Sequence, residues 1–124
     1  MSEFGLPYSE RLRSFGAVRR LFESGSGGFV YPFRYIVYAE PDAEFSVRVL
    51  FTVPKRNHKR ANARNLLRRR TKEAYRLNKS IIHNCGKAVS VDMALIYSSK
   101  ESTDYKTIEN AVRRILEAVA SSVQ

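Results

Sequence analysis

Apolar residues recur along the chain with two spacings, and each spacing predicts a different kind of element. Residues 29–39, 45–53 and 89–97 are rich in β-branched and aromatic residues, which favours three strands. In residues 45–53 every odd position is apolar and the even positions are mixed, so one strand face should be buried and the other partly open. Residues 15–24 and a segment that starts near Asp104 repeat their apolar residues with helical spacing, which predicts a first and a last helix.

Between the second and third predicted strands lies a basic segment, Pro54–Lys79, which starts as a loop to about Arg60 and continues as a helix. On a helical projection, one arc of about 100° is polar and mostly basic. Its members are Asn65, Arg68, Arg69, Lys72, Arg76 and Lys79. The opposite side should pack on the sheet and consists of Ala63, Leu66, Leu67, Ala74, Leu77 and Ile81. Arg64 lies beside the basic arc, whereas Arg70 projects into the apolar side, from which its head group should reach solvent.

The order of elements is therefore helix, strand, strand, basic helix, strand, helix. This order predicts an α+β sandwich in which the basic helix connects two strands of one sheet. The length of 124 residues fits a single domain, which we assign to residues 10–124. Residues 1–9 are expected to form a flexible arm, and the glycine- and serine-rich residues 25–28 a flexible loop.

Charge separates the basic segment from the remainder of the chain. Pro54–Lys79 holds eleven of the 22 Lys and Arg residues but only one of the 12 acidic residues, Glu73. The formal net charge of +10 thus resides in this segment, and the rest of the chain is balanced. Such a concentration favours a polyanionic partner, with nucleic acid ahead of anionic lipid or acidic proteins. The alternative is a solvated charged face, which mutual repulsion along the helix disfavours.

Other features exclude several classes of protein. The single cysteine, Cys85, rules out an internal disulfide and a cysteine-cluster zinc site, and it fits a reducing, cytoplasmic setting. No apolar run approaches the roughly 20 residues that cross a bilayer, and residues 1–10 lack a secretory pattern, so we expect no membrane partner. The acidic residues are scattered, which argues against a metal site built by the protein alone. His58 and His83 flank the basic helix at opposite ends, roughly 30 Å or more apart if the helix is continuous, which disfavours an acid–base pair.

Tyrosines and arginines indicate a second surface. Tyr38 shares the even face of its strand with Arg34 and Ile36, and we expect Arg48 and Thr52 of the next strand beside them. An open sheet face of this composition suits the stacking of single-stranded bases. Ordinary core and rim tyrosines are an equally good interpretation of the same pattern.

The run RNLLRRRTKEAYR, from Arg64 to Arg76, resembles the hallmark of the bacterial ribonuclease P protein component. That family reads roughly R-N-R-x-K-R-x-x-R-E-x-[FY]-R at this place. The resemblance covers about residues 10–120 and includes the closing strand and helix. Its further matches are Arg11-Leu12 with Val18 and Phe22, the strand residues Tyr35 to Tyr38, and the lead-in Phe51 to Lys55. Three departures are Leu66 in place of the usual Arg, Val18 in place of an aromatic residue, and a loop one residue longer.

The resemblance implies a small subunit of a ribonucleoprotein that removes the 5′ leader from precursor tRNA. In that family the RNA subunit cleaves with Mg²⁺, and a helix crosses between parallel strands in a left-handed sense. It implies no catalytic residue in the protein and no stable protein partner. The implied contacts with the catalytic RNA are Arg64, Asn65, Arg68, Arg69, Lys72 and Arg76. The implied contacts with the leader are Phe22, Tyr35, Tyr38, Lys55 and Arg56.

Two other functions remain open from the sequence. One is a ribosomal protein or another assembly factor that binds structured RNA with a similar α+β fold. The other is a stand-alone nuclease that uses His58 and His83.

Overall fold

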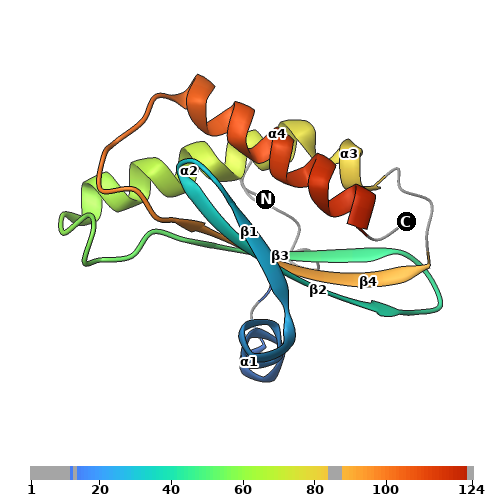
Figure 1. Ribbon diagram of the computed structural model, residues 1–124. Helices are drawn as coiled ribbons and strands as arrows, with labels where there is room; N and C mark the ends of the chain where they lie inside the picture. The colour runs from blue at the N-terminus through green and yellow to red at the C-terminus, as the bar shows by residue number, and fades with distance from the viewer. Residues whose placement is uncertain (1–11, 13, 84–87, 123–124) are drawn as a thin grey trace, which may run out of the picture.

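The computed structural model describes residue 12 and residues 14–83 and 88–122. Four strands form one sheet in the order β1 (Ser26–Val30), β2 (Phe33–Pro41), β4 (Val89–Tyr97) and β3 (Ser46–Thr52). The helices are α1 (Phe15–Ser24), α2 (Ala61–Asn78), the short α3 (Ser80–His83) and α4 (Tyr105–Ser122). Helices α2 and α4 cover one face of the sheet and α1 lies against the other (Figure 1). The predicted α+β sandwich is confirmed.

Strand β4 lies in the middle of the sheet, and this placement corrects one sequence expectation. It pairs antiparallel with β2 and parallel with β3, and α2 connects the two parallel strands as predicted. Strands β2 and β3 are therefore not neighbours. Tyr38 and Arg48 share a row across the sheet, but Asp92 of β4 stands between them.

Residues 29–39 do not form a single strand. The chain turns at Tyr31-Pro32, whose peptide bond is cis, and the expected loop at residues 25–28 belongs largely to β1. Proline has no backbone N–H to donate to a strand ladder, which explains why the strand breaks there. Gly27 permits the pairing, because a Cβ atom at this position would collide with the carbonyl oxygen of Tyr35. Glycine carries no hydrophobic pattern, so β1 was not visible in the spacing of apolar residues.

The main core lies between the sheet and the pair α2 and α4. The alternation predicted for β3 is confirmed, since Val47 and Val49 are buried while Ser46 is exposed. The helical stripe predicted for α4 is also confirmed and is buried along its length. Its members are Ile108, Ala111, Val112, Ile115, Leu116 and Val119.

Helix α2 is rotated relative to the sequence prediction. Its buried residues are Leu67, Thr71, Ala74 and Tyr75. The expectation that Leu66 and Leu77 pack on the sheet is wrong, because their exposed fractions are 38% and 54%. The helix packs against both the sheet and α4, and two of its buried side chains, Thr71 and Tyr75, end in a hydroxyl group. Thr71 donates its hydroxyl to the Leu67 carbonyl at 2.8 Å, and the Tyr75 ring meets the Phe51 ring edge-on at 5.7 Å between centroids.

A smaller cluster holds α1 on the opposite face of the sheet. Ala17 and Leu21 of α1 pack on Ile36 of β2 and Ala94 of β4. Leu12 belongs to the same cluster, and its backbone N–H donates to the Val49 carbonyl at 3.1 Å, beside the edge strand β3. The expected arm at residues 1–9, together with Arg11 and Cys85, lies outside the described residues.

Candidate RNA interface

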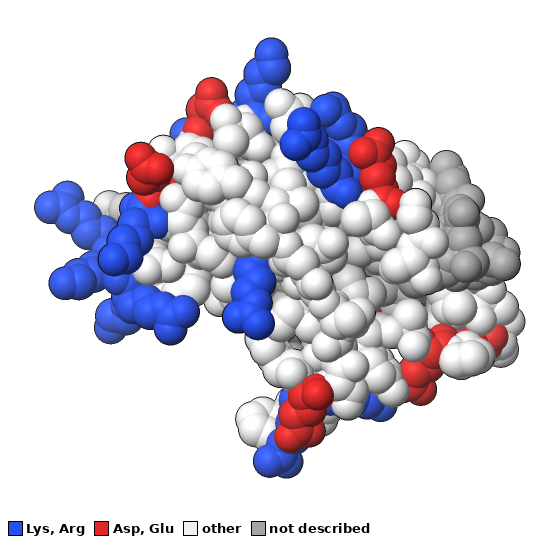
Figure 2. Space-filling view, in the orientation of Figure 1, with Lys and Arg blue, Asp and Glu red and all other residues white. Residues whose placement is uncertain are grey.

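The basic side chains gather where the loop of residues 54–60 meets the start of α2. Figure 2 shows several Lys and Arg side chains close together at this end of the molecule. Lys55, Arg56, Lys59 and Arg60 of the loop are all exposed. The N-terminus of α2 adds the positive end of the helix dipole. Nothing in the first turn compensates it, because this turn contains no acidic residue and Arg60 makes no side-chain cap. The field that an approaching polyanion meets is therefore strongest here.

Three side chains hold this loop in one conformation. The His58 ring bonds the Ser99 carbonyl from Nε2 at 2.8 Å and meets the Tyr97 ring edge-on at 5.4 Å. Asn57 donates its amide Nδ2 to the Ser98 carbonyl at 3.3 Å. Arg64 donates Nη1 to the carbonyls of His58 and Lys59 at 3.0 and 2.8 Å. Arg64 thus fixes the loop from within α2, in addition to the RNA contact that the resemblance assigns to it.

The other basic positions of α2 differ in how far their charge is compensated. Arg76 makes a bidentate pair with Glu73 at 2.9 and 2.7 Å, and this hydrogen bonding lowers the pKa of Glu73. Arg68 donates to the Asn65 side-chain oxygen at 3.2 Å, and because this amide is neutral it does not offset the arginine charge. Arg69 is exposed. The compensated charge lies in the C-terminal half of α2, whereas the loop adds Lys55, Arg56, Lys59 and Arg60 next to the N-terminal half, so positive charge is densest where the loop meets the helix.

Arg70 leaves the apolar side of α2 as predicted, but its head group does not extend freely into solvent. Its Nη1 donates to the Thr103 carbonyl at 2.8 Å, in the connection between β4 and α4. The head group therefore ends on backbone rather than in open solvent. This bond ties α2 to the same connection that anchors His58 and Asn57.

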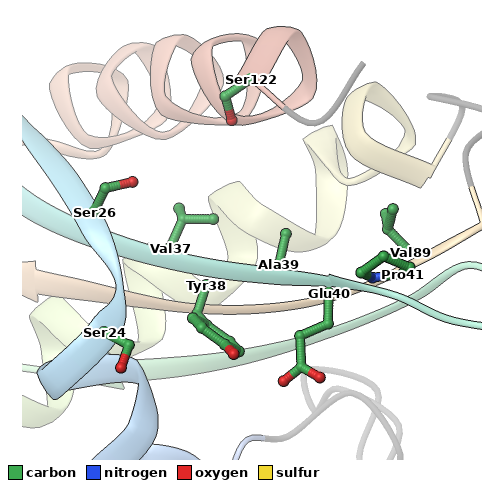
Figure 3. Close-up of a pocket in the computed structure, with 9 residues that line it drawn as sticks. All are labelled: Ser24, Ser26, Val37, Tyr38, Ala39, Glu40, Pro41, Val89 and Ser122. Atoms are coloured by element: carbon green, nitrogen blue, oxygen red, sulfur yellow. The ribbon is translucent and has the colours of Figure 1, made fainter.

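On the α1 face of the sheet, Tyr38 is already engaged by its neighbours. The Arg20 guanidinium lies over the Tyr38 ring, 5.2 Å from its centroid. The nearby Glu40 carboxylate is the largest of the causes that raise the pKa of Tyr38. Figure 3 shows Tyr38 and Glu40 pointing to the α1 side of β2 and Val37 and Ala39 pointing to the α4 side; all four line a hollow of about 400 Å³ that extends to both sides of the strand. One face of the Tyr38 ring is thus covered by the protein itself.

The row that contains Tyr38 also holds a buried ion pair. Arg48 donates Nε and Nη2 to the two carboxylate oxygens of Asp92 at 3.0 and 3.1 Å. Arg20 Nη2 approaches Asp92 at 3.7 Å and Arg20 Nη1 approaches Glu40 at 3.6 Å. The two arginines and two carboxylates balance in charge, and they link α1 to three strands. This cluster positions α1 over the sheet.

The structure brings some of the residues implied as leader contacts together and separates others. Tyr35 packs against the main core on the α2 and α4 face, opposite to Tyr38. Phe22 stands about 200° around α1 from Arg20, so it lies on the flank of the helix away from Tyr38. Its neighbours there include Phe29 and Arg34, which share a hollow with it. Sequence reasoning did not single out Phe29, because its exposure depends on the unforeseen strand β1.

The side chains offer little for catalysis by the protein alone. Among the described residues there is no group of three or more His, Cys, Asp or Glu that could hold a metal ion. Two of the acids that face the basic surfaces, Glu73 and Asp92, are paired with arginines. In the described part of the chain, therefore, no cluster of side chains would hold Mg²⁺ by itself. His58 packs on Tyr97 and His83 on Phe45, beyond opposite ends of α2.

These features define a basic α+β protein with one highly charged interface and a second, partly open sheet face. None of the helices in the described part of the chain is long and apolar enough to span a membrane. The Ribonuclease P family model matches residues 6–120, and the chain belongs to this family. Membership gives it a role within an endoribonuclease complex and a partnership with the RNA subunit of that complex.

Relatives and solved structures agree with this assignment. The ribonuclease P protein component of Porphyromonas gingivalis is 34% identical over 124 residues, which span 97% of this chain and 90% of the relative. The RNase P protein from Thermotoga maritima, solved with 1-(4-fluorophenyl)-2-thiourea, superposes with a TM-score of 0.69 at 23% identity, over 86% of this chain and 97% of the other. The Staphylococcus aureus RNase P protein gives a TM-score of 0.67 at 19% identity, over 93% and 92% of the two chains. At these identities the two structures support the fold.

Proposed function

We propose that this chain is the protein subunit of a ribonuclease P ribonucleoprotein that matures the 5′ ends of tRNA. In this proposal it binds the catalytic RNA and the 5′ leader of precursor tRNA and promotes Mg²⁺-dependent endonucleolytic removal of the leader. The observation that carries the proposal is the confinement of the net charge to residues 54–79, on the exposed loop and helix α2. The cytoplasm, where tRNA matures in bacteria, is the proposed compartment.

The contact with the catalytic RNA is assigned to α2, through Arg64, Asn65, Arg68, Arg69, Lys72 and Arg76, and to Lys59 and Arg60 just before the helix. Arg68 and Arg69 carry charge there that no carboxylate of the described helix offsets, whereas Arg76 is paired with Glu73. Each phosphate neutralised by a cation releases condensed counterions. With about six such contacts, log K should fall by roughly 4–5 for each tenfold rise in salt concentration.

The leader is assigned to the strip of sheet between α1 and the basic loop. Phe22 offers an exposed ring on the α1 flank, and Lys55 and Arg56 follow the end of β3 on the other side. Aromatic faces stack on unpaired bases and cations hold the backbone, with little demand on sequence. Tyr38 lies on the far flank of α1 under Arg20 and is not included in this path. Tyr35 packs against the main core but also contributes to the hollow that Phe22 lines.

The division of labour follows from the chemistry of the side chains. The protein supplies cations and aromatic rings, which reduce repulsion between two RNA molecules and position one of them. Mg²⁺ supplies Lewis-acid chemistry to phosphoryl transfer when it is bound. Because the described side chains do not form a metal site, we assign Mg²⁺ to the RNA subunit and the substrate.

Cleavage of precursor tRNA tests the proposal. Purified protein alone should leave the substrate intact, and protein added to a bacterial ribonuclease P RNA should restore processing at low Mg²⁺ concentration. Cleavage by the protein without RNA would support a nuclease that uses His58 or His83. Failure to stimulate the cognate RNA subunit would favour a ribosomal or assembly role.

A further inference from the structure

A hollow of about 360 Å³ lies between α1 and the β1–β2 hairpin, on the flank of α1 away from Tyr38. Two phenylalanines line it and remain unusually exposed, Phe22 at 47% and Phe29 at 62%. Exposed phenyl rings grouped in one concave site are a feature of ligand-binding surfaces. Gly25, Gly27 and Gly28 also line the hollow and contribute no side chain to it.

Arg34 gives this hollow its charge. Phe29 of β1 and Arg34 of β2 are paired directly across the hairpin, so their side chains are neighbours on the same face. Arg34 is exposed, and no carboxylate lines the hollow. Two aromatic faces beside one guanidinium match the base and the phosphate of an unpaired nucleotide. A small acidic ligand would use only the guanidinium, and a purely apolar ligand only the two rings.

A partly exposed row of the sheet connects the hollow to the basic loop. Arg34 is paired with Ile96 of β4, and Ile96 with Thr52 at the end of β3. Helix α1 packs mainly on the next row, Ile36 and Ala94, and Ile96 packs against the same cluster while it stays half-exposed. The row crosses from β1 to β3, roughly 14 Å at the usual strand spacing. Thr52 is followed after two residues by Lys55 and Arg56.

We propose that this hollow is a nucleotide subsite in which Phe22 and Phe29 hold one unpaired leader base and Arg34 holds its phosphate. The inference rests on the proposed function and extends it, since Phe29 and Arg34 become contacts for the distal part of the leader. A leader that enters at Lys55 must cross the sheet before it reaches the hollow. The subsite therefore engages only leaders above a minimum length.

The test uses the reconstituted holoenzyme and precursor tRNAs whose leaders are lengthened one nucleotide at a time. Phe29→Ala and Arg34→Ala should each weaken substrate binding on the order of tenfold once the leader passes the minimum length, and leave shorter leaders unaffected. Phe29→Trp should retain binding, because an aromatic face remains. The matched controls are Phe15→Ala, an 83% exposed phenylalanine outside the hollow, and Arg114→Ala on α4. Both controls should bind all leaders as the unaltered protein does.

An abasic scan locates the bound nucleotide. Removing the base at one leader position should weaken binding by the unaltered protein and have no further effect on Phe29→Ala, a coupling that adjacent positions should lack. If Phe29→Ala equals the unaltered protein at every leader length, the subsite is wrong, even though the protein still stimulates the RNA subunit. If the protein does not stimulate the RNA subunit at all, the proposed function itself fails.

Discussion

The His58 ring and the Ser99 carbonyl are joined by a 2.8 Å hydrogen bond that fastens the basic loop to the β4–α4 connection. The same connection receives Arg70 of α2 at Thr103 and the Tyr31 hydroxyl of the β1–β2 hairpin, which donates to Glu101 at 3.1 Å. One short segment thus positions the loop, the basic helix and the hairpin relative to one another. His58, considered from sequence as part of a nuclease pair, has a positioning role in the structure.

Replacing His58 should loosen the basic loop. We expect His58→Ala to weaken binding to the catalytic RNA several-fold and to reduce the slope of log K against log salt, because loop cations no longer stay on phosphates. His58→Gln can still donate an amide N–H toward Ser99 and should recover most of the affinity. A loss of affinity with an unchanged salt slope and no rescue by glutamine would contradict this role. Filter binding over a salt series measures both quantities.

Replacing Arg68 and Arg69 together should weaken assembly with the catalytic RNA. If both contact phosphates, the salt slope should fall by about 1.5 in addition to the loss of affinity. Arg113→Ala with Arg114→Ala removes the same charge from the exposed side of α4 and serves as the control. Equal losses in the two double variants would mean that overall charge, rather than the surface of α2, drives binding.

The Arg48–Asp92 pair should contribute to the stability of the fold. Asp92 is buried, so Arg48→Met leaves a buried carboxylate with only the more distant Arg20, and we expect a loss of about 1–3 kcal/mol in the free energy of unfolding. The Arg19–Glu23 pair is exposed on α1, and Arg19→Met should change stability by less than about 0.5 kcal/mol. Urea unfolding compares the two. Equal stabilities would show that the buried pair adds nothing to the fold.

The cap of α4 should make stability depend on acidic pH. Asp104 accepts a hydrogen bond from the Thr107 backbone N–H at 2.9 Å, and the hydrogen bonds from Thr107 hold the pKa of Asp104 below its usual range. A carboxyl whose pKa is lower in the folded state stabilises the protein above its unfolded pKa. That contribution disappears as the pH falls through the folded pKa.

Thermal unfolding over an acidic pH series tests this cap. Asp104→Asn retains the capping oxygen and should lose this part of the pH dependence, while Asp104→Ala should be less stable at neutral pH as well. A pH profile of Asp104→Asn that matches the unaltered protein would contradict the assignment.

The sequence predicted those elements whose apolar residues repeat with one clear period. Strand β3 and helix α4 have such patterns, and both were located with their buried faces. Strand β1 was missed because its first residues are serine and glycine. The rotation of α2 was missed because Thr71 and Tyr75, which hydropathy counts as polar or mixed, are buried, while Leu66 and Leu77 are exposed. Tertiary packing on two sides decides that orientation.

The candidate site was only partly predictable for a similar reason. The basic segment is contiguous in the chain, so composition alone located it. The resemblance grouped Phe22 and Tyr38 as leader contacts, but α1 lies between their side chains, and only the packing of Leu21 on Ile36 reveals this. The anchoring of the loop by Asn57 and His58 depends on contacts with residues about 40 positions away in sequence, which no local pattern encodes.

The central claim is that two surfaces of this protein bind two different RNAs, and leader-length dependence tests it most directly. Substrate binding by the reconstituted holoenzyme is compared for Phe22→Ala and for the Arg68→Ala, Arg69→Ala double variant, with a short and a long leader. We expect Phe22→Ala to weaken substrate binding only with the long leader. The double variant assembles less with the catalytic RNA, so it should weaken substrate binding equally with the short and the long leader. Equal dependence of the two variants on leader length would contradict the claim.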